Sequence, residues 1–247
     1  MSVAIQYSGR LGNNMFQYAF ARLMQEARGG ELHEVSGAFK FAQHFPNVLK
    51  CKPRPNDKYE IMDETRDFEG FKGKVMRLHP SINVELHGYF QNWEYYRGNE
   101  WLLRTWFKLP PMNFKPDKND IVMHIRRDDY LQAKSALDFQ YYDLILNNFY
   151  RKIYITGEID KETELHFSKY PNVEYIYKNE IETLQFIKTF QNIAISNSTF
   201  AWWGAMLSDA QNIYCPKPIT GYWSDEQTQR LFVPERMLQI GNIRVNK

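Results

Sequence analysis

The second half of the chain alternates regularly between short apolar runs and longer amphipathic segments. Strands are expected at residues 121–123, 152–156, 173–177, 193–195 and 212–215, and helices at 137–150, 161–169, 181–190 and from 197 through 207. Strict alternation of strand and helix is typical of a parallel sheet with helices on both faces. The pattern therefore predicts an α/β domain in which 212–215 is the last clear strand.

The first half has the same character but is less regular. A strand is expected at 2–7, a helix at 15–28, a further strand at 82–86 and a helix at 94–108, whereas 31–81 gives no clear pattern. The stretch 110–119 is rich in proline and mixed charges, as linkers are. We therefore predict two domains, 1–112 and 113–247, and leave open that the last helix packs back on the first domain.

Composition excludes several classes of protein. A net charge of +2 and no basic stripe argue against a nucleic-acid partner. No apolar run of membrane-spanning length and no signal-peptide pattern occur, so we expect a cytoplasmic protein, with peripheral membrane association left open. The two cysteines, Cys51 and Cys215, lie far apart and are expected to be free.

Two adjacent arginines follow the predicted strand 121–123. Arg126 and Arg127 would be costly at the end of a buried strand unless an anion meets them, and the planar guanidinium suits phosphate. In open α/β sheets, ligands lie beyond the carboxyl ends of strands. Either a phosphate-bearing ligand binds here, or the arginines lie on the surface and pair with Asp128 and Asp129.

A second polar turn, Asn197-Ser198-Thr199, lies between a predicted strand and a predicted helix. These residue types are ordinary helix caps, but together with a helix N-terminus they also form a phosphate cradle. Trp202, close behind the turn, would be an odd choice for simple capping. Because parallel strands put their carboxyl ends at one edge, this turn and Arg126 are expected to share a nucleotide diphosphate.

A metal ion is not expected at this site. The chain contains no Asp-x-Asp, the usual carboxylate pair for a metal on a sugar-nucleotide diphosphate. Asp128 and Asp129 are adjacent, and adjacent side chains of an extended chain point apart. Arginine and helix N-termini would then neutralise the phosphates.

Two segments of the first half have two interpretations each. The turn 8–14, between a strand and a helix, is either a tight connection or an anion-binding loop that includes Gly12 and Asn13. The aromatic cluster 87–96 is either core or an apolar platform for a sugar ring.

Four segments together resemble one known family. Residues 9–18 (GRLGNNMFQY), 87–92 (HGYFQN), 124–130 (HIRRDDY) and 195–205 (ISNSTFAWWGA) are similar to motifs of bacterial α-1,2-fucosyltransferases, glycosyltransferase family 11. The motifs occur in the family's order and cover about residues 5 to 215. The resemblance implies a GT-B-like α/β fold, with two Rossmann-like domains facing a cleft. It also implies GDP-L-fucose as donor, inversion at the anomeric carbon and no metal or other cofactor.

The resemblance also implies roles for individual residues. Arg126 would hold the β-phosphate and stabilise departing GDP, Asn13 would reach across from the first domain to the phosphate and sugar, and Asp129 is the nearest candidate base. Arg127 would support the site from behind. The remaining donor-side positions are Gly12, His124, Gly157, Glu158, Asn197, Ser198, Thr199 and Trp202.

Two departures from the family pattern concern the donor side. Asp128 stands where the family has glycine. If that glycine needs a positive φ, aspartate is one of the few tolerated replacements, but it adds a negative charge near the phosphates. Gly157-Glu158 stands where the family often has S-D-D. Both departures leave the identity of the donor sugar open, and they affect the reaction class less.

The sequence thus predicts transfer of L-fucose from GDP-L-fucose to a hydroxyl of a galactoside-type glycan, in α-1,2 linkage. A transferase or hydrolase that uses another GDP-sugar, or a non-catalytic glycan-binding protein of the same fold, remains an alternative. Acceptor, general base and oligomeric state are not specified.

Overall fold

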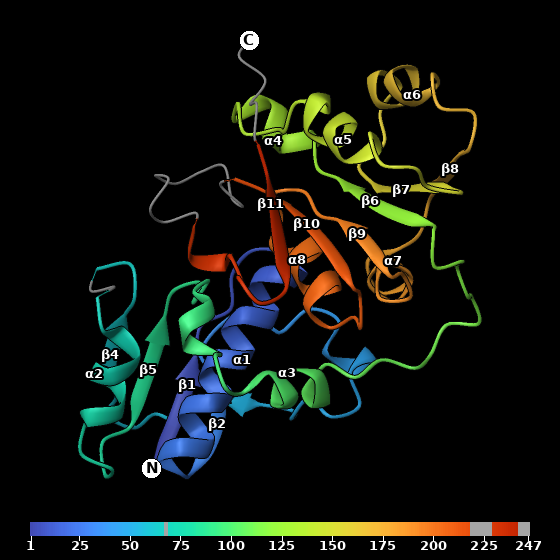
Figure 1. The fold of residues 1–247 in the computed structure, drawn as a ribbon. Coiled ribbons are helices and arrows are strands. Elements are labelled where there is room, and N and C mark those ends of the chain that lie inside the picture. Colours follow the sequence, from blue (N-terminus) through green and yellow to red (C-terminus); the bar gives the residue numbers. More distant parts are fainter. Residues whose placement is uncertain (67–68, 218–228, 242–247) are drawn as a thin grey trace. The chain divides into compact units, whose positions relative to one another are not determined.

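The chain forms two compact units, Met1–Lys108 and Leu109–Lys247. The structure is a computed structural model and describes residues 1–66, 69–217 and 229–241. Each unit is built around one parallel sheet (Figure 1). The sequence analysis had placed the domain boundary between 112 and 113.

Unit 1 contains a five-stranded sheet with the order β3-β2-β1-β5-β4. Its strands are β1 (Ser2–Ile5), β2 (Glu31–Glu34), β3 (Lys52–Pro53), β4 (Glu60–Asp63) and β5 (Val84–His87). Its helices are α1 (Leu11–Arg28), α2 (Phe71–Arg77) and α3 (Glu100–Trp106), with 3-10 turns η1 (Ala42–His44) and η2 (Trp93–Tyr95). Neighbouring strands are all parallel. The chain builds outward from β1 to β3 and then returns to β1's other side, which makes the β1/β5 junction a topological switch point.

Unit 1 departs from the sequence analysis in two helices. Helix α1 begins at Leu11, not at Met15, so the expected turn supplies its first residues. The helix expected at 94–108 is interrupted, because η2 ends at Tyr95 and α3 starts only at Glu100. Gly98 between them has a positive φ of 81°, which a continuous helix does not allow.

The aromatic cluster 87–96 is mostly core. Phe90 and Tyr96 are fully buried, and the Phe90 ring stacks on Phe20 of α1 with 4.5 Å between ring centroids. Tyr89 is the exception and is exposed. Burial of these rings supplies much of the apolar area that holds β5 and α1 together.

Unit 2 contains a six-stranded sheet with the order β11-β10-β9-β6-β7-β8. Its strands are β6 (Ile121–Ile125), β7 (Ile153–Gly157), β8 (Val173–Ile176), β9 (Asn192–Ala194), β10 (Asn212–Pro216) and β11 (Met237–Ile240). Its helices are α4 (Asp128–Gln132), α5 (Phe139–Leu146), α6 (Lys161–Phe167), α7 (Glu180–Ile187) and α8 (Thr199–Met206), with the 3-10 turn η3 (Gln229–Leu231). Helices α4, α5 and α6 lie on one face of the sheet, and α7 and α8 on the other (Figure 1).

Strand β6 contributes side chains to both faces, as its pleat requires. Ile121, Met123 and Ile125 pack into the cluster formed with α5 and α6. His124 points to the opposite face, where its ring lies 5.6 Å from that of Phe200 on α8. The chain runs from β6 outward to β8 and returns at β9, so the switch point of this sheet lies between β6 and β9.

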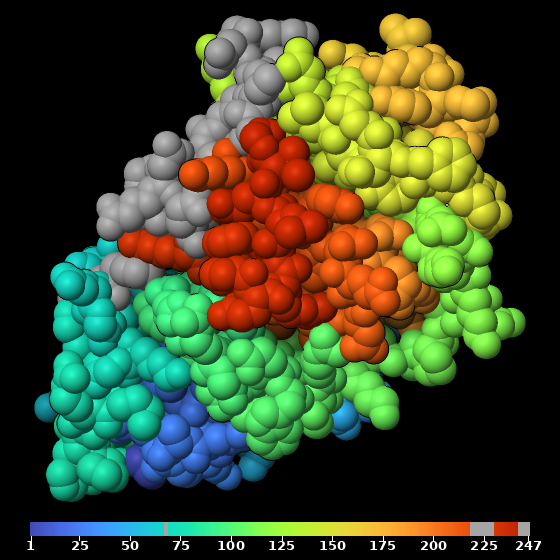
Figure 2. All heavy atoms as spheres, in the orientation of Figure 1, coloured from blue at the N-terminus to red at the C-terminus, as the bar shows by residue number. Residues whose placement is uncertain are grey.

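The C-terminal part differs from the expectation. Strand β11 follows β10 and pairs with it in parallel, although 212–215 was expected to be the last strand. It lies at the surface in Figure 2, and its Leu238 is 50% exposed. Residues 229–241 contain no α-helix, and the remaining positions for an expected last helix, 218–228 and 242–247, lie outside the described residues.

Candidate functional site

The four sequence motifs lie in pairs at the two switch points. The loops after β1 and β5 carry the first two motifs, and the loops after β6 and β9 carry the other two. Loops at a switch point splay apart and leave a crevice, which is where open α/β sheets bind ligands. The topology therefore gathers the candidate residues without any appeal to the motifs themselves.

Arg126 lies directly after β6, held between two carboxylates. Its Nη1 donates to Oε1 of Glu158, and its Nη2 donates to Oδ1 of Asp129 over 2.5 Å. The guanidinium also lies over the ring of Tyr130, 4.9 Å from the centroid. These contacts fix the orientation of Arg126 at the carboxyl end of β6. Its side chain is 13% exposed, so it still reaches solvent.

Arg127 is buried and holds the N-terminus of α6 in place. Its side chain is only 3% exposed and covers the ring of Phe139 at 4.5 Å. Its Nε donates to Oδ2 of Asp160 over 2.8 Å, and its Nη2 pairs with Glu162. The backbone N–H of Arg127 donates to the second oxygen of Glu158 over 2.7 Å. Arg127 thus supports Arg126 indirectly, because it fixes the carboxylate that orients it.

Asp160 links this arginine to the helix behind it. Its Oδ1 caps α6 by accepting the N–H of Thr163 over 2.7 Å. Burial raises the pKa of Asp160, but hydrogen bonds from Thr163 and Arg127 outweigh burial and hold that pKa below its usual range. The carboxylate therefore stays charged and holds Arg127 throughout the neutral range.

His124 joins the two strands of the switch point from inside the sheet. Its Nδ1 lies 2.9 Å from Oγ of Ser196, which follows β9, and its side chain is 5% exposed. Burial, and then the charge of Arg126, lower the pKa of His124 to about 3. The ring is therefore neutral, and it serves as a hydrogen-bonding spacer rather than as a cation.

The second polar turn follows β9, the strand that pairs with β6. The side-chain amide of Asn197 donates to the carbonyl of Ser135 over 2.7 Å. Its Oδ1 is buried and has no hydrogen-bond partner among the residues that the structure describes. Ser198 occupies the N-cap position of α8 without a side-chain capping hydrogen bond, and Thr199 is the first residue of the helix. A helix N-terminus with a buried amide beside it provides backbone donors for an anion.

Trp202 is a correction to the predicted site. Its side chain is fully buried, and its indole N–H donates to the carbonyl of Leu231 over 2.8 Å. Its ring packs edge-on against Trp203 with centroids 5.0 Å apart. Trp202 therefore anchors η3 to α8 and belongs to the core, so it offers no surface to a ligand.

Gly157 allows β7 to approach β6 closely at the site. Its φ is +104°, and a Cβ there would lie 2.3 Å from the carbonyl oxygen of Ile125 and 3.2 Å from Nε2 of His124. Only glycine fits this position. Glu158, the next residue, is thereby brought against Arg126.

Asp128 does not have a positive φ, so this position does not require the conformational freedom of the family's glycine. Among the described residues other than glycine, only Phe41, Phe90 and Lys134 have positive φ. Asp128 and Asp129 instead form the first turn of α4, not an extended segment. Negative side chains are favourable at a helix N-terminus, which is why aspartate is accommodated here.

No metal centre is formed by residues 1–66, 69–217 and 229–241, where no three His, Cys, Asp or Glu side chains come together as ligands. The same ranges contain no helix of the length and apolarity that crossing a bilayer requires.

In unit 1, two amides that the sequence analysis did not single out hold the switch point. Gln17 of α1 donates to the carbonyl of Gly88 and to Oγ of Ser8, both over 3.0 Å, and accepts the N–H of Ser8. Asn14 donates to the carbonyl of Ser8 over 2.9 Å. Both are buried on an otherwise apolar helix face, and amides at a spacing of three there were the signal that was missed.

Gly12 and Asn13 lie in the first turn of α1 at the same place. Gly12 is buried. Oδ1 of Asn13 accepts a hydrogen bond of 3.1 Å from Nε2 of Gln91, which follows β5. Gly9 has a φ of +79°, and a Cβ there would lie 2.3 Å from Nδ2 of Asn13, so this turn requires glycine.

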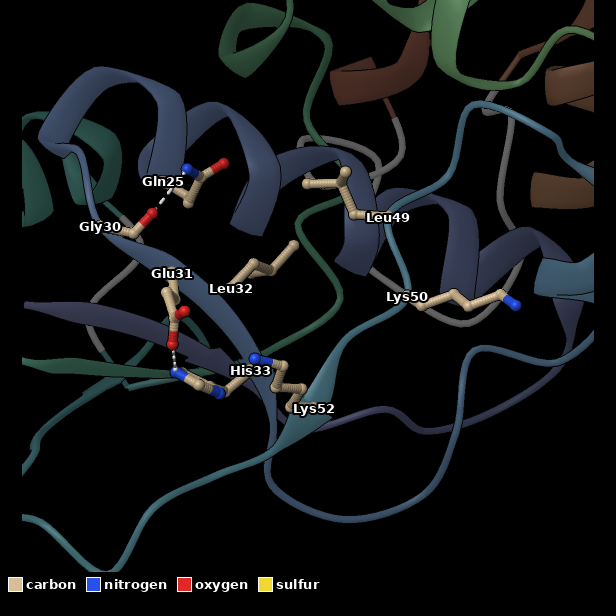
Figure 3. Close-up of a pocket in the computed structure, with 8 residues that line it drawn as sticks. All are labelled: Gln25, Gly30, Glu31, Leu32, His33, Leu49, Lys50 and Lys52. Carbon is tan, nitrogen blue, oxygen red and sulfur yellow. Dashed lines mark hydrogen bonds and ion pairs between the residues drawn. The ribbon is translucent and has the colours of Figure 1, made fainter.

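A cavity of about 230 Å³ lies elsewhere in unit 1 (Figure 3). It is found beside the start of β2, and Glu31, His33, Lys50 and Lys52 are among the residues that line it. None of the predicted site residues lines it, and the start of a strand is the end opposite to the switch-point loops. We therefore place the candidate site at the switch points and not at this cavity.

Two units, each with a parallel sheet and with its candidate residues beyond the strand ends, define an α/β fold of the GT-B type. The chain is similar to NodZ α-1,6-fucosyltransferase soaked with GDP-fucose, with a TM-score of 0.54 and 12% identity over 84% of this chain and 92% of that one. It is also similar to E. coli heptosyltransferase WaaC with ADP, with a TM-score of 0.51 and 9% identity over 98% of this chain and 93% of that one.

A relative is also found by sequence. The chain is 25% identical to an alpha-1,2-colitosyltransferase of Escherichia coli, over 97% of this chain and 99% of that protein. No protein-family profile matches the chain.

Proposed function

We propose that this protein is an inverting glycosyltransferase related to family 11, which transfers L-fucose from GDP-L-fucose to a hydroxyl of a galactoside-type glycan in α-1,2 linkage. The observation that carries the proposal is the orientation of Arg126 at the β6/β9 switch point, where the N-terminal turn of α8 follows β9. Similarity to a colitosyltransferase over nearly the whole chain supports sugar transfer as the reaction class.

The proposed chemistry follows from charge. When an acceptor hydroxyl attacks the anomeric carbon, negative charge builds on the departing β-phosphate. The guanidinium of Arg126 stabilises that charge, together with the backbone N–H groups of the turn at Ser198 and Thr199. Hydrogen-bond donors that are positioned before the reaction stabilise developing charge without reorganisation. The ion pair with Glu158 matters because it positions the guanidinium of Arg126 in this way.

Binding of a diphosphate at Arg126 requires an exchange of partners. Asp129 is the carboxylate that gives way, because its side chain is 46% exposed whereas Glu158 is 16% exposed and fixed by the N–H of Arg127. Once released, Asp129 is placed to accept the proton of an acceptor hydroxyl.

The reaction is proposed to need no metal, because arginine and a helix N-terminus take the place of a cation on the diphosphate. We expect the enzyme to keep its activity in EDTA, so that neither Mg²⁺ nor Mn²⁺ is needed to restore it. We propose a cytoplasmic location, where GDP-sugars are at hand for such an enzyme.

A donor other than GDP-L-fucose should be tested beside it. The relative's name specifies a colitosyl group, and the Gly157-Glu158 turn departs from the family pattern on the donor side. A GDP-sugar other than GDP-L-fucose is therefore the alternative within the same reaction class.

The experiment is a panel of GDP-sugars incubated with β-galactoside acceptors, with products read by mass. Transfer from GDP-L-fucose, with a product larger than the acceptor by one deoxyhexose, supports the proposal. Transfer from another GDP-sugar alone selects the alternative donor. Binding of the glycans without turnover of any donor would instead indicate a glycan-binding protein.

A further inference from the structure

The turn that follows β5 has a strained backbone. Gly88 has a φ of +143° and Phe90 a φ of +53°, with Tyr89 between them. A bulky side chain at positive φ is rare, because its Cβ crowds the backbone. Such conformations persist only where the surrounding structure holds them, and they concentrate at functional sites.

Three contacts hold Phe90 in this conformation. Its ring stacks on Phe20, with 4.5 Å between centroids and 4° between planes. Its N–H donates to Oε2 of the buried Glu64 over 2.5 Å, and its carbonyl accepts the hydroxyl of the buried Tyr96 over 2.7 Å. Ring, donor and acceptor are therefore all fixed from the interior of the unit.

Gly88 is fixed as firmly. Its carbonyl accepts the amide of Gln17, and a Cβ at this position would lie 2.7 Å from Cβ of Glu64. The turn therefore has one conformation, and its effect is to turn the two residues beside Phe90 away from the core. Tyr89 is 37% exposed, and Gln91 is partly exposed.

The groups presented in this way are neutral. Tyr89 offers an aromatic ring, and Gln91 bonds to Asn13 from the other side of the switch point. An aromatic ring packs against the C–H face of a pyranose, while side-chain amides supply both donors and acceptors for its hydroxyl groups. The position beyond the carboxyl ends of β1 and β5 is where a parallel sheet binds its ligand.

We propose that Tyr89, Gln91 and Asn13 form a subsite for one neutral pyranose, the acceptor sugar, which the strained turn holds in a preformed arrangement. That this sugar is a galactoside rests on the proposed function. The binding of a neutral sugar at this turn does not rest on the proposed function, because such binding requires no donor.

Saturation-transfer NMR with methyl β-galactoside and lactose tests the subsite without any turnover. The wild-type protein is expected to transfer saturation to the sugar protons, and Tyr89→Ala to weaken binding about fivefold through loss of the stacked ring. Tyr89→Phe keeps the ring and is expected to bind within about twofold of wild type. Trp101→Ala removes a ring that is 65% exposed on α3 and is expected to change nothing.

Absence of transfer to either sugar in the wild-type protein would overturn the subsite, and so would equal binding by wild type and Tyr89→Ala. If the protein transfers sugar, a second measurement separates the two proposals. Tyr89→Ala and Gln91→Ala are then expected to raise the KM for the acceptor while the KM for the donor stays constant. A rise in donor KM alone would contradict the subsite while leaving the transferase proposal intact.

Discussion

The two switch points share a topology but are built from different chemistry. At the β1/β5 junction, the loops are held by amides, with Gln17 bonded to Gly88 and Asn13 bonded to Gln91. At the β6/β9 junction, Arg126 is held by Glu158 and Asp129 beside a neutral His124. The same crevice geometry is thus suited to a neutral ligand in unit 1 and to an anion in unit 2. The side chains at the strand ends, and not the fold, therefore set the ligand class.

The largest effect is expected at the charged junction. Arg126→Ala should lower kcat by about 10²–10³-fold, because it removes the main donor to the leaving phosphate. Arg66→Ala is the matched control, since Arg66 is 86% exposed in unit 1, and it should leave kcat unchanged. Steady-state kinetics measure both. Turnover by Arg126→Ala at the wild-type rate would remove the distinction between the two junctions.

The close approach of β7 to β6 gives the next effect. Gly157→Ala should lower the free energy of unfolding by roughly 2–4 kcal/mol, from positive φ together with the clash at the Ile125 carbonyl. Gly98→Ala shares the positive φ, at +81°, but has nothing within 4 Å of its Cβ, and so isolates the strain term. Urea unfolding of both variants measures the difference. Equal losses would mean that the packing at the charged junction is looser than described.

The neutral state of His124 predicts a pH dependence. Its pKa is about 3 in the folded protein and about 6.5 when unfolded, so stability is full above pH 6.5 and is lost as the pH falls toward 3. The loss approaches about 1.4 kcal/mol per pH unit within this window, because only the unfolded chain takes up the proton. His124→Gln should show a shallower decline in urea unfolding between pH 6.5 and 4.5. Parallel declines in the two proteins would show that His124 is protonated when folded.

The smallest effect concerns the carboxylate proposed to give way. Asp129→Asn should raise the affinity for GDP by about threefold, because it removes a partly exposed competitor for Arg126. Asp128→Asn removes the same charge one residue earlier and controls for the general change in field. Calorimetry with GDP distinguishes them. Equal gains in both variants would assign the effect to net charge and not to the contact with Arg126.

Unit 2 was predictable from the sequence because its strands are buried. The run from Ile121 predicted β6, and the alternation of segments predicted the parallel sheet. One edge strand of this sheet was harder to detect. Strand β11 lies at the sheet's edge, where Leu238 is half exposed and the apolar pattern is short.

Unit 1 was less predictable for a related reason. Strands β2 and β4 carry charged residues at both ends, and β4 and the two-residue β3 form the edges of the sheet. Such strands need no continuous apolar run. The early start of α1 was missed because Gly12 and Asn13 are weak helix formers, and tertiary amide contacts override that preference.

The site was predicted as a set of positions, and geometry assigned what each one does. Arg126 and Glu158 were both singled out, but only the structure brings them together across β6 and β7. Trp202 was wrongly included, because the sequence does not show that its indole is bonded to Leu231. Asp128 begins a short helix, α4, that the sequence analysis did not recognise.

The account depends most on the claim that the β6/β9 junction binds phosphate through Arg126. Calorimetric titration with GDP and with guanosine measures that claim directly, in wild type and in Arg126→Ala. We expect GDP to bind the wild-type protein at least about tenfold more tightly than guanosine, and this preference to disappear in Arg126→Ala. Equal binding of GDP and guanosine by the wild-type protein would contradict it.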